Sequence, residues 1–259
     1  MKKYTLITGG SGGLGLELAR LFAKDENNLL LISSNLDKLN KAKEELLKEY
    51  KVEIETLALD LSNPSNFSKV KEFSIKHGMF INNLVNCAGF GDRTDFTQMD
   101  IDKQIQMVEL NCNAPMYLMH AYLQDMIEKQ EGHILNISSI AGFVPGPFMS
   151  TYHATKAFVS NLSQGVEREL KGTKVKLTCV CPGPFDSAFV AKAGNEYTFS
   201  KIKPMTTLKV AEISYKALKK NKSFKVIGFK NKLMMFLTRF APRKMVINTS
   251  ARQIKKDSK

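Results

Sequence analysis

Thr8-Gly9-Gly10-Ser11-Gly12-Gly13-Leu14-Gly15 is the stretch of sequence that decides the fold. It stands between a short apolar run at 4–8 and an amphipathic stretch at 14–24, so we expect a strand before it and a helix after it. Glycines let the backbone approach a pyrophosphate, and a helix N-terminus supplies free N–H groups and a positive dipole end. The alternative is a tight turn that needs positive φ angles, but five glycines in seven residues exceed that need.

The rest of the chain alternates between apolar, β-rich runs and longer helical patterns. We expect further strands at 28–33, 52–59, 83–86, 132–137, 175–181 and 224–227. We expect further helices at 36–50, from Pro64 onward, and at 100–129, 152–171 and 206–220. This alternation predicts an α/β fold with a single doubly wound parallel sheet, the Rossmann fold, and helices on both faces.

The helix expected around Leu118 is apolar on nearly all sides. Such a helix is covered on both sides, by the sheet and by something else. We therefore expect a homodimer or a homotetramer in which this helix and the helix at 152–171 form the subunit interface.

The composition excludes several classes of protein. With 43% hydrophobic and 24% charged residues, the chain is neither disordered nor fibrous. No apolar run approaches the roughly 18 residues needed to cross a bilayer, and the first residues do not resemble a signal peptide. The four cysteines, at 87, 112, 179 and 181, form no CxxC pair. These features predict free thiols, a cytoplasmic location and no metal site.

The end of the second expected strand bears on the choice of cofactor. A site for NAD usually has an Asp or Glu there, on the ribose 2′-hydroxyl. This chain has Ser33 and Ser34 instead, with Lys38 one helical turn farther on. Two hydroxyls can hydrogen-bond a 2′-phosphate, so we expect NADP(H) to be preferred over NAD(H). The alternative is that Ser33 and Ser34 simply cap the following helix.

A Ser, Tyr and Lys constellation carries the expected chemistry. Tyr152 and Lys156 are four residues apart on one face of a helix, and Ser139 ends the fifth expected strand. Hydride transfer to a carbonyl leaves an oxyanion that needs a proton. A nearby ammonium lowers the pKa of a tyrosine toward the range of a general acid/base, and a serine hydroxyl stabilises the developing charge. The carboxyl ends of parallel strands would bring Ser139, Tyr152 and the glycine loop together.

With these motifs in place, the chain resembles the short-chain dehydrogenase/reductase family over about residues 4–228, and its tail resembles that of a bacterial branch with a basic amphipathic extension. The matching motifs are Thr8-Gly9-x-x-x-Gly13-x-Gly15, Asn86-x-Ala88-Gly89, Asn111, Ser139, Tyr152-x-x-x-Lys156 and Pro182-Gly183. Ser187 departs from the pattern, because the family more often has Thr there, and Cys87 stands where Asn is frequent.

The resemblance implies roles for individual residues. Tyr152 would be the general acid/base, Lys156 would hold the nicotinamide ribose, and Ser139 would orient the carbonyl. Asn111 would support a water that links Lys156 to solvent. The residues implied or expected to bind the cofactor are Gly9, Ser11, Gly12, Gly13, Leu14, Gly15, Ser33, Ser34, Asp60, Leu61, Asn86, Ala88, Gly89, Tyr152, Lys156, Pro182, Gly183, Phe185 and Ser187.

Together these observations predict an oxidoreductase that transfers a hydride between NADP(H) and a carbonyl or secondary alcohol. We expect a dinucleotide-binding and catalytic domain at 1–228, with a substrate loop at about 185–205, and an extension at 229–259. Apolar residues in and near the loop favour an apolar small-molecule substrate; they are Phe143, Pro145, Phe148, Phe185, Phe189 and Phe199. They can equally be packing residues of the loop.

Two other functions remain as alternatives. One is a non-catalytic nucleotide-sensing or scaffold protein on the same fold. The other is an epimerase or dehydratase of nucleotide sugars, which shares Tyr-x-x-x-Lys but normally needs a longer C-terminal domain.

The net charge of +13 is concentrated in the last quarter of the chain. Residues 192–259 hold 18 of the 38 basic and only 3 of the 25 acidic side chains. Within 230–244, Leu233, Phe236, Leu237 and Phe240 fall on one helical face flanked by bases, and Pro242 ends or kinks that helix. Packing on the domain or a second subunit, simple solubility, peripheral membrane contact, and recruitment of an acidic substrate such as an acyl thioester are the alternatives. We expect no nucleic-acid partner, since no basic groove with interleaved aromatic residues is visible.

Overall fold

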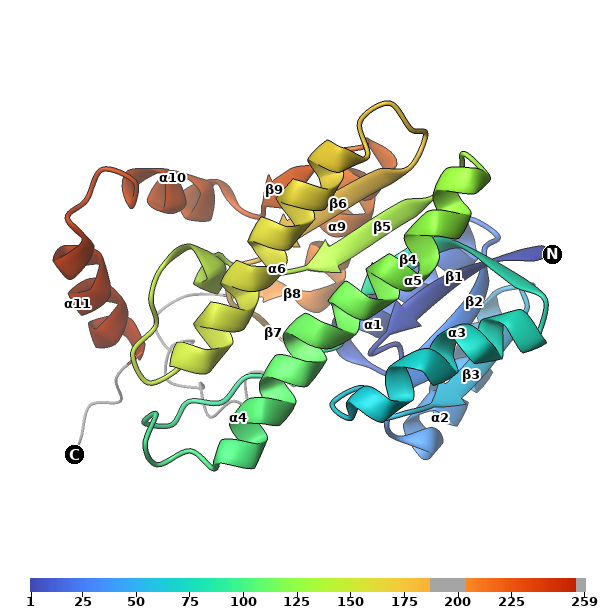
Figure 1. The fold of residues 1–259 in the computed structure, drawn as a ribbon, viewed down its shortest axis with the longest axis horizontal. Helices are drawn as coiled ribbons and strands as arrows, with labels where there is room; N and C mark the ends of the chain where they lie inside the picture. The colour runs from blue at the N-terminus through green and yellow to red at the C-terminus, as the bar shows by residue number, and fades with distance from the viewer. Residues whose placement is uncertain (187–203, 255–259) are drawn as a thin grey trace.

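A parallel sheet of seven strands in the order β3-β2-β1-β4-β5-β6-β9 runs through the middle of the molecule (Figure 1). The computed structural model describes residues 1–186 and 204–254. The strands of the sheet are β1 (Lys2–Thr8), β2 (Asn28–Ser33), β3 (Ile54–Ala58), β4 (Met79–Asn86), β5 (His133–Ile137), β6 (Lys176–Cys181) and β9 (Phe224–Val226). The predicted doubly wound fold is therefore confirmed. The strand order reverses direction between β1 and β4, and in such sheets ligands bind outside the carboxyl ends of the strands at that point.

Helices connect the strands and cover both faces of the sheet (Figure 1). They are α1 (Gly13–Lys24), α2 (Leu36–Glu49), α3 (Phe67–Lys76), α4 (Ile101–Val108), α5 (Ala114–Glu128), α6 (Ser150–Glu169), α9 (Thr207–Lys219), α10 (Phe229–Leu237) and α11 (Arg243–Ile254). Short 3₁₀ helices occupy Pro64–Asn66 and Ile140–Phe143. A small two-stranded sheet pairs β7 (Phe185–Asp186) with β8 (Met205–Thr206).

Two of the differences from the sequence-based expectation have a physical reason. Strand β4 begins at Met79, four residues before the expected start at residue 83. The expectation was too short because the polar Asn82-Asn83 pair interrupts the apolar pattern. The Asn83 amide is buried and donates to the Thr5 hydroxyl of β1, at 3.1 Å. The stretch expected as one helix at 100–129 is α4 and α5 joined by a π-helical turn at Glu109–Asn113.

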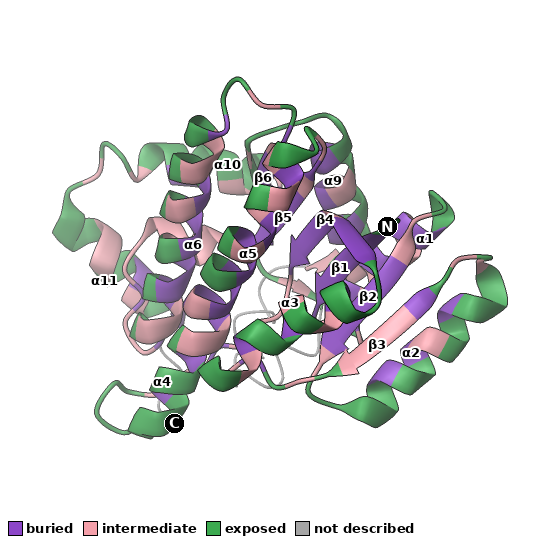
Figure 2. Ribbon diagram, turned by 45° about the vertical axis from the view of Figure 1, so that its right-hand side comes forward, coloured by how far each residue is buried: buried purple, intermediate pink, exposed green. Residues whose placement is uncertain are grey.

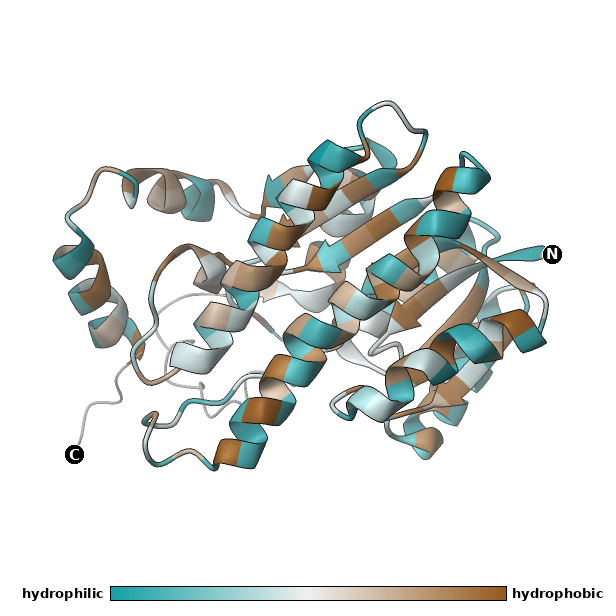
Figure 3. Cartoon of the chain, in the orientation of Figure 1, coloured by the Kyte–Doolittle hydropathy of each residue, from teal (hydrophilic) through white to brown (hydrophobic). Residues whose placement is uncertain are grey.

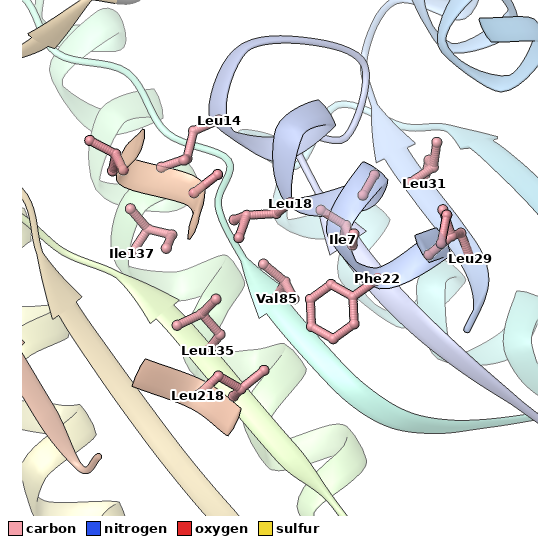
Figure 4. Packing of buried hydrophobic residues seen from close by; sticks show 14 of the residues in the cluster. Ile7, Leu14, Leu18, Phe22, Leu29, Leu31, Val85, Leu135, Ile137 and Leu218 are labelled. Carbon is pink, nitrogen blue, oxygen red and sulfur yellow. The ribbon is translucent and has the colours of Figure 1, made fainter. Parts of the chain in front are cut away.

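The core forms two apolar layers, one on each face of the sheet. One layer lies under α1, α2 and α9 and includes Ile7, Leu18, Phe22 and Val85 (Figure 4). The other lies under α3, α5 and α6 and includes Leu84, Leu118 and Tyr122. Both layers are fully enclosed, whereas the outer faces of the helices are exposed (Figure 2). The sheet is therefore a rigid platform that fixes where its strands end.

No helix within 1–186 or 204–254 combines the length and the apolar character needed to cross a membrane. The two C-terminal helices α10 and α11 lie together at the end of the molecule opposite the N-terminus (Figure 1).

Candidate active site

A cleft of about 1220 Å³ opens along the carboxyl ends of the strands. Its lining extends from the glycine loop, past β2, β4, β5 and β6, to α10 and α11. A volume of this size exceeds that of an ordinary ligand pocket of about 300–1,000 Å³. The cleft therefore has room for a dinucleotide and a second molecule side by side.

The glycine loop forms one end of this cleft. Gly9 adopts a positive φ of 70°, and a Cβ at this position would lie 3.1 Å from Ala88 Cα in the loop after β4. A Cβ on Gly15 would lie 2.2 Å from the Gly9 carbonyl oxygen. Helix α1 begins with no side-chain cap, so its first N–H groups stay available toward the cleft. The loop thus has the close packing and the open helix N-terminus that an anion such as a pyrophosphate needs.

Thr8 joins this loop to the loop after β4. Its hydroxyl accepts hydrogen bonds from the backbone N–H groups of Cys87 and Ala88, both at 3.0 Å.

Asn86, at the end of β4, is not among the residues that line the cleft. Its side-chain amide donates to Asn136 Oδ1 at 2.8 Å, between β4 and β5. The predicted contact between Asn86 and a cofactor has no support from this geometry, because the side chain is held inside the sheet.

Ser33 and Ser34 line the cleft at the end of β2, together with Lys38. The alternative in which these serines cap the next helix is wrong, because Asn35 caps α2 by accepting from the Lys38 N–H at 2.8 Å. Ser11 of the glycine loop donates to the Ser33 hydroxyl at 2.8 Å. The Ser11 hydroxyl of the glycine loop and the Ser33 hydroxyl at the end of β2 therefore lie side by side at this end of the cleft.

Asp60 and Leu61, after β3, also line the cleft. The Asp60 carboxylate accepts from the backbone N–H and the hydroxyl of Ser62, at 2.9 and 2.8 Å. Pro182, Gly183 and Phe185 lie along the cleft after β6. Ser187 and most of the substrate loop expected at 185–205 lie outside the described residues.

Ser139 and Tyr152 come together at the middle of the cleft. Ser139 follows β5, and its hydroxyl accepts from the Ala141 N–H at 3.1 Å as the cap of a 3₁₀ turn. Tyr152 lies in the first turn of α6, and its phenol is close enough to the Ser139 side chain for that side chain to lower the pKa of the phenol. The start of α6 is fixed by neighbours on either side: Thr151 donates to Gln104 at 2.7 Å, and the His153 ring meets the Val144 carbonyl at 2.8 Å.

Lys156 lies one turn farther along α6, only 6% exposed. Its ammonium is 5.8 Å from the centre of the Tyr152 ring and donates to the Ile137 carbonyl at 3.1 Å. Burial lowers the pKa of Lys156, since a charged group loses solvation there. The ammonium therefore faces both the phenol and the end of β5.

The pKa of Tyr152 differs from the sequence-based expectation. Burial raises it from 10.0 to about 12, and the Ser139 side chain offsets this only in part. The expected lowering by Lys156 is not what this geometry produces, because burial of the phenol dominates its pKa and only the Ser139 side chain offsets that burial.

Asn111 does not line the large cleft but lies directly behind Lys156. It is 2% exposed, and its amide spans the Phe90 backbone, donating to the carbonyl at 2.8 Å and accepting from the N–H at 3.1 Å. A small cavity of about 10 Å³ lies between Asn86, Asn111 and Lys156, close to the size of one water molecule. The Oδ1 atom of Asn86 lacks a hydrogen-bond partner among the described atoms. The π-helical turn at Glu109–Asn113 is what brings Asn111 to this position.

Sequence reasoning missed the other wall of the cleft. Helices α10 and α11 supply much of its apolar lining, including Leu233, Met234, Leu237, Met245, Val246 and Ile254. The apolar face predicted for the tail divides in the structure: Leu233 and Leu237 line the cleft, whereas Phe236 and Phe240 do not. Met235, which also lines the cleft, is 5% exposed and anchors the helix. The repeated Leu and Met residues were the signal, but nothing in the sequence shows where the tail folds back.

Residues 3–198 of the chain match the short chain dehydrogenase family. A similar curated protein is an uncharacterized oxidoreductase of Staphylococcus aureus, 29% identical over 189 residues, which cover 73% of this chain and 80% of the relative. Another is an uncharacterized oxidoreductase of Staphylococcus epidermidis, 28% identical over 186 residues, which cover 72% of this chain and 79% of the relative.

Solved structures share this architecture. A short-chain dehydrogenase from Sphingobium yanoikuyae in complex with NADPH has a TM-score of 0.84 and 25% identity, with 100% of this chain and 99% of that chain covered. A bulky-bulky ketone specific alcohol dehydrogenase from Comamonas testosteroni has a TM-score of 0.79 and 25% identity, with 93% and 92% covered. Because the family match spans most of the chain and includes the glycine loop, Ser139, Tyr152 and Lys156, this chain belongs to the short-chain dehydrogenase family of NAD(P)-dependent oxidoreductases.

Proposed function

We propose that this protein is an NADP(H)-dependent oxidoreductase that interconverts an apolar, bulky ketone and its secondary alcohol. The observation that carries this proposal is the meeting of Ser139 and Tyr152, backed by Lys156, in the middle of one cleft that begins at the glycine loop. The cofactor and the carbonyl substrate would then bind in the same cleft.

The nicotinamide cofactor, when bound, supplies or accepts the hydride. The cleft fits such a cofactor, since an added Cβ on Gly12 or Gly13 would meet no other atom within 4 Å. The backbone of the loop and the uncapped N-terminus of α1 would hold the pyrophosphate. Pro182, Gly183 and Phe185 would lie beside the nicotinamide, and Asp60 and Leu61 beside the adenine.

In the mechanism that we propose, Tyr152 gives the proton to the carbonyl oxygen during reduction and takes it back during oxidation. Ser139 donates a hydrogen bond to the same oxygen and stabilises its developing charge. Lys156 holds the ribose of the cofactor and keeps positive charge near the phenol. Asn111 and the small cavity behind Lys156 would provide the route by which the proton is replaced from solvent.

The preference for NADP(H) rests on the end of β2. Ser33, Ser34 and Lys38 line the cleft there, and no Asp or Glu takes the place that favours NAD. Hydroxyl and ammonium groups are donors to a phosphate, whereas a carboxylate would repel it. The NADPH complex of the Sphingobium relative is consistent with this preference.

The substrate class rests on the far wall of the cleft. Leu233, Met234, Leu237 and Met245 give this wall a wide apolar surface. A ketone with bulky apolar groups on both sides would fill it, and the Comamonas relative has bulky ketone specificity. The part of the tail at 229–254 would thus serve as a substrate-binding extension to the domain that we expect at 1–228.

The chain also exposes apolar side chains away from the cleft, which supports a homodimer or homotetramer. Met116 and Tyr117 of α5 are 42% and 38% exposed, and Phe158 of α6 is 37% exposed. Leu118 itself is buried in the core, so the interface would use its outward neighbours. Light scattering on Phe158→Lys tests this, because a shift toward the monomer is expected.

The experiment for the main proposal is consumption of NADPH with a panel of ketones, from acetone to bulky diaryl and polycyclic ketones. Tyr152→Phe should lose at least about a hundredfold in kcat while it still binds NADPH, and Tyr117→Phe is the matched control. Equal turnover by Tyr152→Phe would remove the proton-transfer role. Tight NADPH binding without turnover of any ketone would favour the non-catalytic, nucleotide-sensing alternative.

A further inference from the structure

Helix α10 and the turn that follows it carry aromatic side chains outside the cleft. Phe236 and Phe240 are 53% and 74% exposed, and their ring centres are 5.3 Å apart. Phe229, at the start of the helix, is 80% exposed. None of the three is among the residues that line the cleft. Exposed aromatic groups that lie against each other, as Phe236 and Phe240 do, mark a surface that contacts a partner.

The same helices and the turn between them carry many bases. No Asp or Glu occurs between Glu212 and Asp257. The exposed bases of the two helices and their connecting turn are Lys230, Lys232, Arg239, Arg243, Lys244 and Arg252. None of them forms a salt bridge with another residue in the described part of the chain. The positive charge of this region is therefore available to an anionic partner.

The two helices are fixed to the domain at defined points. Asn231 donates to the Ile227 carbonyl at 2.8 Å, and Met235 is buried. Ile254 of α11 is buried in one cluster with Met149. Both helices stand at the end of the molecule, and both carry apolar and polar residues along their length (Figure 3). The same pair of helices thus bounds the substrate side of the cleft and presents Phe236 and Phe240 outward.

We propose that α10, α11 and the turn between them, residues 229–254, dock this protein on the surface of an anionic lipid membrane. Phenylalanine side chains would enter the boundary between headgroups and acyl chains, while the bases would meet the lipid phosphates. A second copy of the chain is a poorer occupant, because two such faces would bring unpaired positive charges together. Charge complementarity therefore selects an anionic surface.

Membrane docking would explain why the tail lies beside the cleft. This explanation rests on the proposed function, because it needs an apolar ketone as the substrate. An apolar ketone dissolves in the membrane rather than in water. The apolar side chains Leu233, Leu237 and Met245 would receive it directly from the lipid at the mouth of the cleft. The substrate class is thus a membrane-partitioning ketone or secondary alcohol.

The test is co-sedimentation of the full chain with vesicles of phosphatidylcholine alone and of phosphatidylcholine mixed with phosphatidylglycerol. We expect binding to the anionic vesicles only. The double variant Phe236→Ser/Phe240→Ser should weaken it about tenfold or more, and Arg239→Gln/Arg243→Gln should do the same. The matched controls are Ile75→Ser, at an exposed position of α3, and Lys41→Gln/Lys48→Gln on α2; both should bind as the unaltered chain does.

Three results would overturn the docking proposal. One is an absence of binding to anionic vesicles. Another is equal binding by the double phenylalanine variant, which would mean that the bases adsorb without the aromatic face. The third is a change of oligomeric state in that variant, which would assign the face to a second copy.

The failure of docking can be told apart from the failure of the proposed function. Phe236 and Phe240 do not line the cleft. NADPH consumption with a water-soluble ketone, in the absence of vesicles, should therefore be unchanged in their double variant. Activity without vesicle binding would contradict only the membrane-docking proposal. Vesicle binding without activity would contradict only the proposed oxidoreductase function.

Discussion

The Ser139 side chain interacts with the Tyr152 phenol and lowers its pKa, although the two residues come from different elements of the fold. Ser139 is placed by the end of β5 and by the 3₁₀ turn that it caps, whereas Tyr152 is placed by the first turn of α6. The 3₁₀ turn is held to the loop after β6 by the Ile140 N–H, which donates to the Pro182 carbonyl at 3.0 Å, and the start of α6 is held by the hydrogen bond from Thr151 to Gln104. The pair is therefore pre-organised around the position that a carbonyl oxygen would take, which is where electrostatic stabilisation is most effective.

Removing the Ser139 hydroxyl should damage turnover far more than stability. We expect Ser139→Ala to lower kcat by about 10²–10³-fold and to lower the free energy of unfolding by only about 1 kcal/mol through loss of the cap. Steady-state kinetics and thermal unfolding measure the two effects separately. Ser139→Thr keeps the hydroxyl and should regain much of the rate, and Ser150→Ala, an exposed serine of α6, should match the unaltered protein. An unchanged kcat in Ser139→Ala would mean that the carbonyl binds elsewhere.

The raised pKa of Tyr152 predicts a different pH dependence for the two directions of the reaction. With a pKa of about 12, the phenol is protonated across the usual range, so it is ready to act as an acid in reduction. The phenolate needed to oxidise an alcohol is scarce, and its fraction grows with pH. We expect kcat/KM for alcohol oxidation to rise about tenfold per pH unit from 6 to 9, while ketone reduction stays nearly flat over the same range. A plateau of the oxidation rate near pH 7 would show that Lys156 and the bound cofactor lower the pKa more than burial raises it.

Ser33 should decide between the two nicotinamide cofactors. In Ser33→Asp, a carboxylate would replace the hydroxyl that accepts from Ser11. It would repel a 2′-phosphate and accept from a ribose hydroxyl, so we expect NADPH binding to weaken about tenfold or more and NADH binding to improve. Parallel fluorescence titrations of both cofactors measure this. The matched control is Ser62→Asp, another serine on the cleft but after β3, which should leave the ratio of the two affinities nearly unchanged. If NADH already binds the unaltered protein more tightly, the predicted preference is wrong.

Much of the fold was predictable because its signals are local. The glycine loop lies between a strand and a helix, and the alternation of β-rich and helical segments fixes the parallel sheet. The π-helical turn around Asn111 was not predictable, because an inserted residue leaves the helical hydrophobic pattern almost unchanged.

The site was predictable only on the side where strands end. Ser139, Tyr152 and Lys156 follow from their spacing and from the edge of the sheet. The course of α10 and α11 does not, since it depends on a few long-range contacts such as those of Met235 and Ile254. The pKa of Tyr152 was predicted in the wrong direction for a similar reason: spacing shows that Lys156 is near, but it does not show how deeply both groups are buried.

Two glycines offer a direct test of the packing that shapes the cofactor end of the cleft. A Cβ at position 15 would lie 2.2 Å from the Gly9 carbonyl oxygen, so Gly15→Ala must push α1 away from the loop. We expect this variant to lose about 1–3 kcal/mol of unfolding free energy, as overpacked sites do, and to bind NADPH more weakly. Gly165, inside α6, is the matched control, because a Cβ there would meet no atom within 4 Å. Gly165→Ala should instead gain about 0.5–1 kcal/mol, since alanine favours a helix over glycine. Urea unfolding with and without NADPH measures both variants. If Gly15→Ala is as stable as the unaltered chain, the close contact between α1 and the glycine loop does not constrain the packing there.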